Sequence, residues 1–161
     1  MADNELEIIN PPNTLKGKIK EGGPGAVDLE TLEKAEQVIA GMTDSYLEWV
    51  QDDLIKIERA FGELKKASGN RKEQADAIFQ VSHDIKGQGG SFGYDLMTVI
   101  GNELCRLIER QDDFGDAEID AIKVHIDAMR LVIQQKMKGD GGATGQALVD
   151  GIRKVGDKLS K

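Results

Sequence analysis

The sequence has little cysteine and no long apolar run. A single cysteine among 161 residues cannot form an internal disulfide, which makes a reducing, cytoplasmic location the expectation. No apolar stretch approaches the roughly 20 residues that a membrane-spanning helix needs. The first residues, MADNELEI, also lack the basic start and apolar stretch of a signal peptide. We therefore expect a cytoplasmic protein without a membrane span.

Basic and aromatic residues are scarce as well. The 21 Lys and Arg residues are outnumbered by 29 Asp and Glu, which gives a net charge of -8. An acidic chain is a poor candidate for binding nucleic acid. Aromatic residues make up 4% and charged residues 31%, a composition that suits a helical bundle better than a β-sandwich. The length favours one domain with tails.

Glycine and proline divide the chain into three regions. Clusters of both predict a flexible tail over residues 1–27. Residues 28–138 carry the helical periodicity, and residues 139–161 combine a glycine-rich linker with a short basic amphipathic helix. That last helix has Ile152 and Val155 on its apolar side. Docking on the bundle, fraying, and binding to a partner or an anionic surface all remain open for it.

The periodic region predicts an all-α fold. Short polar turns between helices favour an antiparallel, up-and-down four-helix bundle, with an additional N-terminal helix as a lid or extension. Asp28 is the expected N-cap of the additional helix, and Thr43 or Asp44 that of the next. The expected helices run from Asp28 to about Gly41, Ser45 to Ala67, Arg71 to about Gly93, Asp95 to Arg110, and Ala117 to Met137.

The segment SHDIKGQGGSFG, residues 82–93, stands out because it places glycines inside a helix. On a helix of about 100° per residue, His83 lies about 140° from the core-facing Ile78. Gly87 and Gly90 fall beside His83, and Lys86 lies on its flank. Each glycine in a helix costs about 0.8–1 kcal/mol relative to alanine, so the cluster needs a reason.

A reactive histidine supplies that reason. Glycine beside an exposed imidazole leaves room for another molecule to approach. The ring can then attack a phosphoryl group while the Lys86 ammonium stabilises its oxygens. The alternative is a solvated surface histidine at a weakened helix end.

The pattern His83, Lys86, Gly87, Gly90 and Gly93, followed by an apolar helix, resembles the histidine-phosphotransfer (HPt) domain family. The resemblance covers about residues 79–109 and stands as HDIKGQGGSFGYDLMTVIGNELCRLIE. Gln88-Gly89 departs from the small residues that the family more often has there. The departure puts the local rigidity of the helix in question and leaves the motif positions in place.

The resemblance implies a phosphorelay intermediate. His83 would accept a phosphoryl group from the phospho-aspartate of a response-regulator receiver domain and pass it to another receiver. Lys86 would offset phosphoryl charge, and Gly87 and Gly90 would allow the approach. Mg²⁺ would belong to the receiver, so no cofactor or metal site of the chain's own is implied. A hybrid histidine kinase is a further implied partner. ATP-dependent kinase activity is not expected, because the kinase motif usually has a proline a few positions after the histidine and no proline follows His83.

Partner-binding residues are less well defined. Phe79, Gln88, Phe92 and Tyr94 could form part of a docking surface or belong to the core. Sustained heptads are not evident, so we expect a monomer. Two alternatives remain open for the whole chain. One is a non-catalytic helical adaptor or scaffold, and the other is an acceptor domain phosphorylated in trans by the ATP-binding domain of a kinase.

Two further residues need an interpretation. His125 lies opposite the apolar stripe of its predicted helix and has no Lys-Gly pattern beside it, which predicts a solvated surface histidine. Cys105 has no nearby histidine or cysteine with metal-ligand spacing, which favours an ordinary packed or partly exposed thiol.

Overall fold

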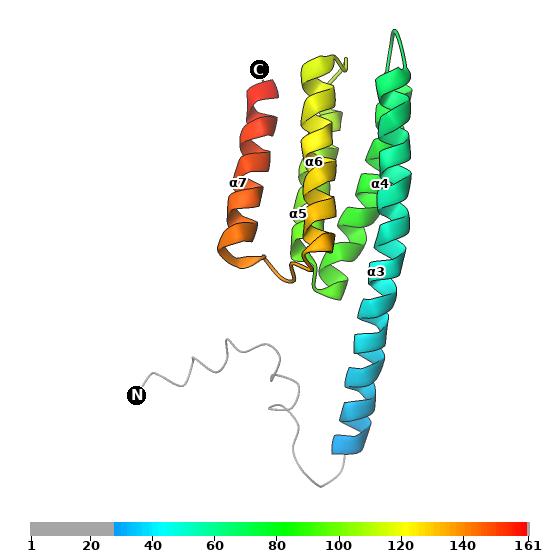
Figure 1. Ribbon diagram of the computed structural model, residues 1–161, viewed down its shortest axis with the longest axis vertical. Coiled ribbons are helices and arrows are strands. Elements are labelled where there is room, and N and C mark those ends of the chain that lie inside the picture. Colours follow the sequence, from blue (N-terminus) through cyan, green and yellow to red (C-terminus); the bar gives the residue numbers. More distant parts are fainter. Residues whose placement is uncertain (1–27, 161) are drawn as a thin grey trace, which may run out of the picture. The chain divides into compact units, whose positions relative to one another are not determined.

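A computed structural model of the chain describes residues 28–160, and residues 1–27 and 161 lie outside the described part, as does the tail predicted there. Every regular element within residues 28–160 is a helix, and no strand occurs among them, so the predicted all-α class is confirmed. No helix in this range combines the length and apolar character needed to cross a membrane. The elements are α3 (Leu29–Lys66), α4 (Lys72–Gly89), the short 3-10 helix η2 (Gly90–Phe92), α5 (Asp95–Glu109), α6 (Asp116–Gln134) and α7 (Gly142–Leu159) (Figure 1).

Helix α3 begins at the predicted N-cap. The backbone N–H of Thr31 donates to Asp28 Oδ1 at 2.7 Å, and hydrogen bonds from Thr31 lower the pKa of the Asp28 carboxyl. The predicted helix end near Gly41 is wrong, because α3 continues without a break to Lys66. Thr43 does not cap a new helix, since its hydroxyl donates to Ile39 O at 3.1 Å. One glycine costs only about 1 kcal/mol, which does not end so long a helix.

The described part of the chain divides into two units at residue 44, and α3 begins in the first and ends in the second. The second unit holds the main apolar core, to which all of its α-helices contribute. Burial of each such side chain is worth about 1.5–3 kcal/mol. Fully buried members include Tyr46, Ile57 and Leu64 of α3, Ile78 of α4, Met97, Ile100 and Leu104 of α5, and Ile122, Met129 and Val132 of α6.

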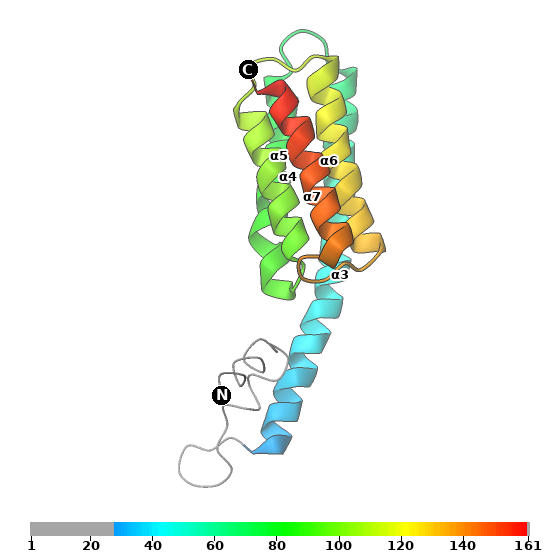
Figure 2. The ribbon, with the colours of Figure 1, turned by 90° about the vertical axis from the view of Figure 1, so that its left-hand side faces the viewer.

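Helix α7 belongs to this second unit. It packs against α5 and α6, and its side chains Val149 and Ile152 are buried (Figure 2). Of the possibilities that the sequence left open, docking on the bundle is the one observed. The glycine-rich region predicted as a linker is short, and Gly139 N–H donates to Gly93 O at 2.6 Å.

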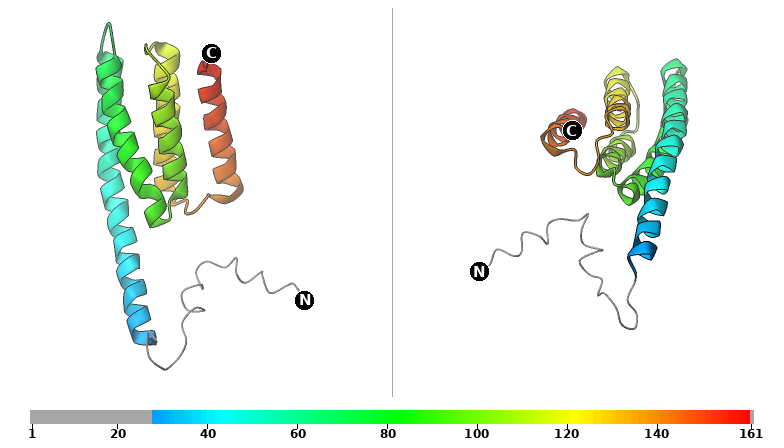
Figure 3. Two further views of the ribbon diagram at one scale, coloured as in Figure 1. Left: turned by 180° about the vertical axis from the view of Figure 1, so that it is seen from behind. Right: turned by 60° about the horizontal axis from the view of Figure 1, so that its bottom comes forward.

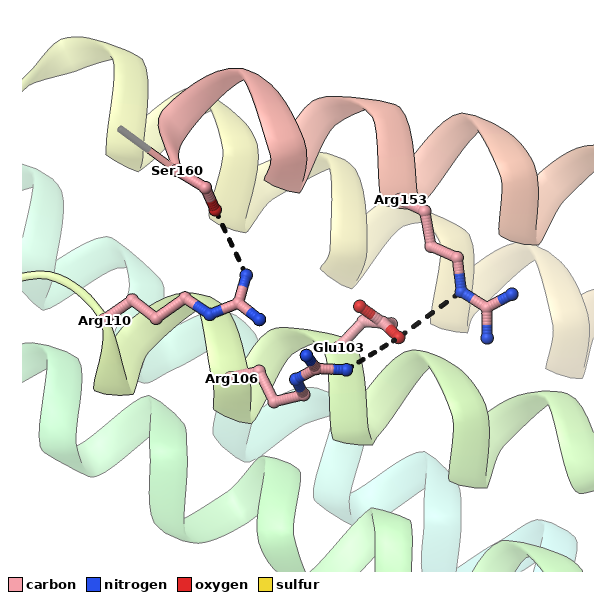
Figure 4. A network of polar contacts seen from close by, with 5 residues as sticks. All are labelled: Glu103, Arg106, Arg110, Arg153 and Ser160. Carbon is pink, nitrogen blue, oxygen red and sulfur yellow. Dashed lines mark hydrogen bonds and ion pairs between the residues drawn. The ribbon is translucent and has the colours of Figure 1, made fainter.

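Polar contacts also join α5 to α7. Glu103 of α5 lies between two arginines, with Arg153 Nε at 3.4 Å and Arg106 Nη1 at 3.9 Å (Figure 4). Nearer the end of α7, Arg110 donates to the Ser160 hydroxyl at 3.1 Å. These contacts are exposed, so each contributes little energy by itself. They add to the apolar contacts by which α7 packs on α5.

The prediction of an exposed His125 is wrong. The side chain is 1% exposed, and Nδ1–H donates to Ala121 O at 2.7 Å. Burial lowers the pKa of His125 below its ordinary value. On a helix of about 100° per residue, His125 lies about 60° from Ile122 and about 40° from Met129, so it lies beside the apolar stripe and not opposite it.

Candidate functional site

His83 lies on the exposed side of α4. The predicted core stripe of this helix is confirmed, since Ala75, Ile78, Ser82 and Ile85 are all buried. His83 itself is exposed. Phe79, one turn earlier, is half-buried and stacks on the imidazole, with ring centroids 6.1 Å apart and planes 25° from parallel. One ring therefore supports another that is open to solvent.

The surface beside His83 is open at Gly87. A Cβ atom added there would meet nothing within 4 Å. A Cβ at Gly90 would make ordinary contacts with Thr98 Oγ1 at 3.5 Å and Asp95 Oδ1 at 3.7 Å. Gly87 thus leaves unoccupied surface one turn from the imidazole, whereas Gly90 lies against the start of α5.

The stem of Lys86 is held against α5. The two helices are neighbours (Figure 3). A Cβ atom at Gly101 would lie 3.0 Å from Lys86 Cβ and 3.1 Å from Ser82 O. The Ser82 hydroxyl donates to Gly101 O at 2.9 Å. The absent side chain of Gly101 therefore lets α5 touch α4 at the level of Lys86.

Gly89 has a different role from Gly87. It is buried, and a Cβ atom there would lie 2.8 Å from Tyr94 O and 2.9 Å from Met97 Cβ. The backbone then reverses at Gly93, whose φ of 83° is left-handed, and Tyr94 N–H donates to Gly89 O at 2.9 Å. The Gln88-Gly89 departure from the family pattern thus supplies a close contact between α4 and α5.

The four predicted docking residues do not share one environment. Phe79 lies beside His83, as described above. Gln88 is half-buried and, five residues along α4, falls about 140° around the helix from His83. Phe92 is half-buried, and Tyr94 is fully buried in the core. Tyr94 therefore has no surface to offer a partner in this structure.

Phe92 belongs to an aromatic cluster with α3. It stacks on Tyr46, with centroids 4.9 Å apart and planes 8° from parallel, and it meets Trp49 edge-on at 6.0 Å. Trp49 is 49% exposed. The sequence favoured a packing role for Trp49, which lies beside the apolar stripe of its helix. That position gave no sign that Trp49 forms an exposed edge of this cluster.

Three residues that shape the site escaped the sequence analysis: Gly89 as a packing contact, Gly101 and Thr98. The Thr98 hydroxyl accepts from Gly90 N–H and donates to Lys86 O, both at 2.9 Å. The one available signal was for Gly101, because it is a glycine in the middle of the predicted helix 95–110. Nothing in the sequence distinguished Thr98 from a surface threonine.

Cys105 is a packed thiol. It is buried, burial raises its pKa, and its sulfur lies 3.9 Å from Phe79 O. A buried thiol with a raised pKa is a weak nucleophile and a weak metal ligand. In residues 28–160, no three His, Cys, Asp or Glu side chains are grouped to hold a metal ion.

Comparison with known families agrees with this geometry. A family model described as Hpt domain matches residues 41–135, more than half of the chain, including His83 and the whole of α4, α5 and α6. Comparison with curated proteins and with solved structures found no match.

Proposed function

Because this chain belongs to the Hpt domain family, whose members carry out histidine phosphotransfer in two-component phosphorelays, we propose that His83 is its phosphoryl acceptor. The group would come from the phospho-aspartate of one receiver domain and pass to the aspartate of another. The observation that carries the proposal is an exposed imidazole supported by Phe79, with open surface at Gly87.

The proposed step is a displacement at phosphorus. An unprotonated ring nitrogen of His83 attacks the phosphorus of the acyl phosphate, the bond from phosphorus to the aspartate oxygen breaks, and the carboxylate leaves. A P–N bond replaces a P–O bond, and no other reactant is consumed. Transfer to the second receiver reverses these events on a new carboxylate.

The neighbouring residues have distinct proposed roles. Lys86 offsets charge on the phosphoryl oxygens as they arrive. Gly87 keeps the approach clear, and Phe79 holds the ring plane. Gly90 has a smaller role in access, because it lies against α5.

The Mg²⁺ of the reaction is proposed to belong to the receiver domain. We assign Mg²⁺ to the acidic pocket of the receiver, where it neutralises phosphoryl oxygens. The reaction would take place on an antiparallel four-helix bundle formed by residues 45–66 of α3 with α4, α5 and α6, as a monomer. A hybrid histidine kinase is the upstream source that suits such an intermediate.

The proposal is tested by transfer from receivers. Purified receiver domains, charged with acetyl phosphate and Mg²⁺, are mixed with wild type, His83→Gln, Lys86→Gln and Lys123→Gln. Lys123 is the matched control, because it is an exposed lysine on α6. We expect acid-labile label on wild type and Lys123→Gln, none on His83→Gln, and transfer to Lys86→Gln slowed about tenfold.

Each other result has a meaning. Label on His83→Gln would contradict the proposal. Label that appears only with ATP and a kinase would favour the alternative in which the ATP-binding domain of a kinase phosphorylates this chain in trans. Partner binding that survives in His83→Gln, with no label on wild type, would favour a scaffold.

A further inference from the structure

A side chain of α5 bonds to the last turn of α4, the turn that follows His83. In a regular α-helix, the N–H of Gly90 would donate to the carbonyl of Lys86, four residues earlier. Here the Thr98 hydroxyl stands between them. It accepts from Gly90 N–H at 2.9 Å and donates to Lys86 O at 2.9 Å. One hydroxyl can make both bonds at once, because it carries a donor and two acceptor lone pairs.

This insertion coincides with the end of α4. The backbone itself stays helical there, with φ of -54° and ψ of -51° at Gly89 and φ of -63° and ψ of -33° at Gly90. At this point α4 gives way to η2, and Gly93 then turns the chain into α5. The hydroxyl comes from α5 itself, so the end of α4 is tied to the next helix and not only to its own backbone.

Lys86 is held at a second point from the same helix. Gly101 follows Thr98 by three residues on α5, which places both on one side of it. A Cβ at Gly101 would lie 3.0 Å from Lys86 Cβ and 3.2 Å from Lys86 Cα. The carbonyl of Lys86 is thus bonded to Thr98, and its stem packs on Gly101. Both contacts fix the direction in which the Lys86 side chain starts.

We propose that Thr98 is a positioning residue for phosphoryl transfer, whose hydroxyl ties residues 86–90, the last turn of α4, to α5 and so fixes the backbone that carries Lys86 and Gly87. This inference rests on the proposed function of His83. Without the hydroxyl, Gly90 N–H and Lys86 O both lose their partner on α5. The last turn of α4 would then be tied less firmly to α5, and the backbone of Lys86 would be free to shift.

The test compares Thr98→Val, which removes the hydroxyl and keeps the shape, with Thr98→Ser, which keeps the hydroxyl. Phosphorylation of His83 by phosphoramidate is followed by intact mass over time. We expect a rate about tenfold lower for Thr98→Val, since small displacements of a reacting group can cost that much. Thr98→Ser should stay within about twofold of wild type, as rescue by the conservative variant requires.

Two further variants separate positioning from a general effect. Thr43→Val removes another threonine hydroxyl bonded to a backbone carbonyl, at Ile39 O, and should react like wild type. In a Lys86→Gln background, Thr98→Val should add little, because its effect passes through Lys86. A full additional tenfold loss in that background would overturn the proposed route.

Hydrogen exchange gives a readout independent of the reaction and of variant folding. In wild type, the Gly90 amide should be protected from hydrogen exchange. Its NMR chemical shift should move in Thr98→Val but little in Thr98→Ser. A fast-exchanging Gly90 amide in wild type would overturn the inference, as would equal phosphorylation rates for wild type and Thr98→Val. If wild type itself takes no phosphoryl group while the Gly90 amide is protected, it is the proposed function that fails, and the positioning role falls with it.

Discussion

Alanine at Gly87 and alanine at Gly89 should change stability in opposite directions, although the two glycines are two residues apart. Alanine is favoured over glycine in a helix by about 1 kcal/mol. At Gly87 nothing lies within 4 Å of the added Cβ, so Gly87→Ala should gain close to that amount. At Gly89 the same atom would lie 2.8 Å from Tyr94 O and 3.0 Å from Thr98 N, which are backbone atoms.

The cost at Gly89 follows from those neighbours. Overpacking typically costs about 1–3 kcal/mol, and backbone atoms that are themselves hydrogen-bonded move least. Gly89 is also the last residue of α4, so its gain in helix propensity is smaller. We expect a net loss of about 2 kcal/mol for Gly89→Ala, and therefore a difference of about 3 kcal/mol between the two variants.

Urea unfolding measures both variants directly, since a change in midpoint at constant slope reports stability. Gly87→Ala should also slow transfer from a receiver domain more than it slows reaction with phosphoramidate, because only the larger donor needs the cleared surface. A Gly89→Ala variant as stable as wild type, or a destabilised Gly87→Ala, would refute this reasoning.

Three further predictions concern the core. Burial lowers the pKa of His125, so the unfolded chain binds a proton more readily than the folded one, and the free energy of unfolding should fall as the pH drops below the ordinary pKa of 6.5. His125→Leu should remove this loss between pH 7.5 and 5.5, and an unchanged pH dependence of stability in the variant would contradict the prediction. The Tyr46 hydroxyl is buried without a hydrogen-bond partner among residues 28–160, and its pKa is raised to about 12, chiefly by burial. Tyr46→Phe should therefore change the free energy of unfolding by less than about 1 kcal/mol, and a loss above about 2 kcal/mol would show that the hydroxyl is bonded. Ile152 of α7 is 2% exposed, so Ile152→Ala should lower the free energy of unfolding in urea by about 2–4 kcal/mol, whereas Val124→Ala, at an exposed position, should lower it little. A negligible loss of stability in Ile152→Ala would mean that α7 is not docked.

Sequence periodicity predicted what lies within single helices. The buried stripe of α4, the exposure of His83 and the N-cap at Asp28 all depend on spacing along one segment, and all were correct. The false end near Gly41 shows the limit of local signals. A residue preference of about 1 kcal/mol is outweighed when the residues on both sides favour helix.

The rest depends on which helices meet. Thr98 acts on residues eight and twelve positions away, and Gly101 lets α5 reach Lys86, so neither is visible on a wheel drawn for α4. His125 was misplaced because it lies beside the apolar stripe of α6, and the packed helix is buried over a wider arc than that stripe. Tyr94 shows the same limit, since an aromatic residue beside a motif can face the core as readily as a partner.

The central claim is that His83 accepts a phosphoryl group, and intact-mass spectrometry after incubation with phosphoramidate tests it most directly. Wild type and His83→Ala are compared, with folding of both checked by circular dichroism. The account predicts an acid-labile gain of one phosphoryl group on wild type and none on His83→Ala. No gain on folded wild type, or the same gain on His83→Ala, would contradict it.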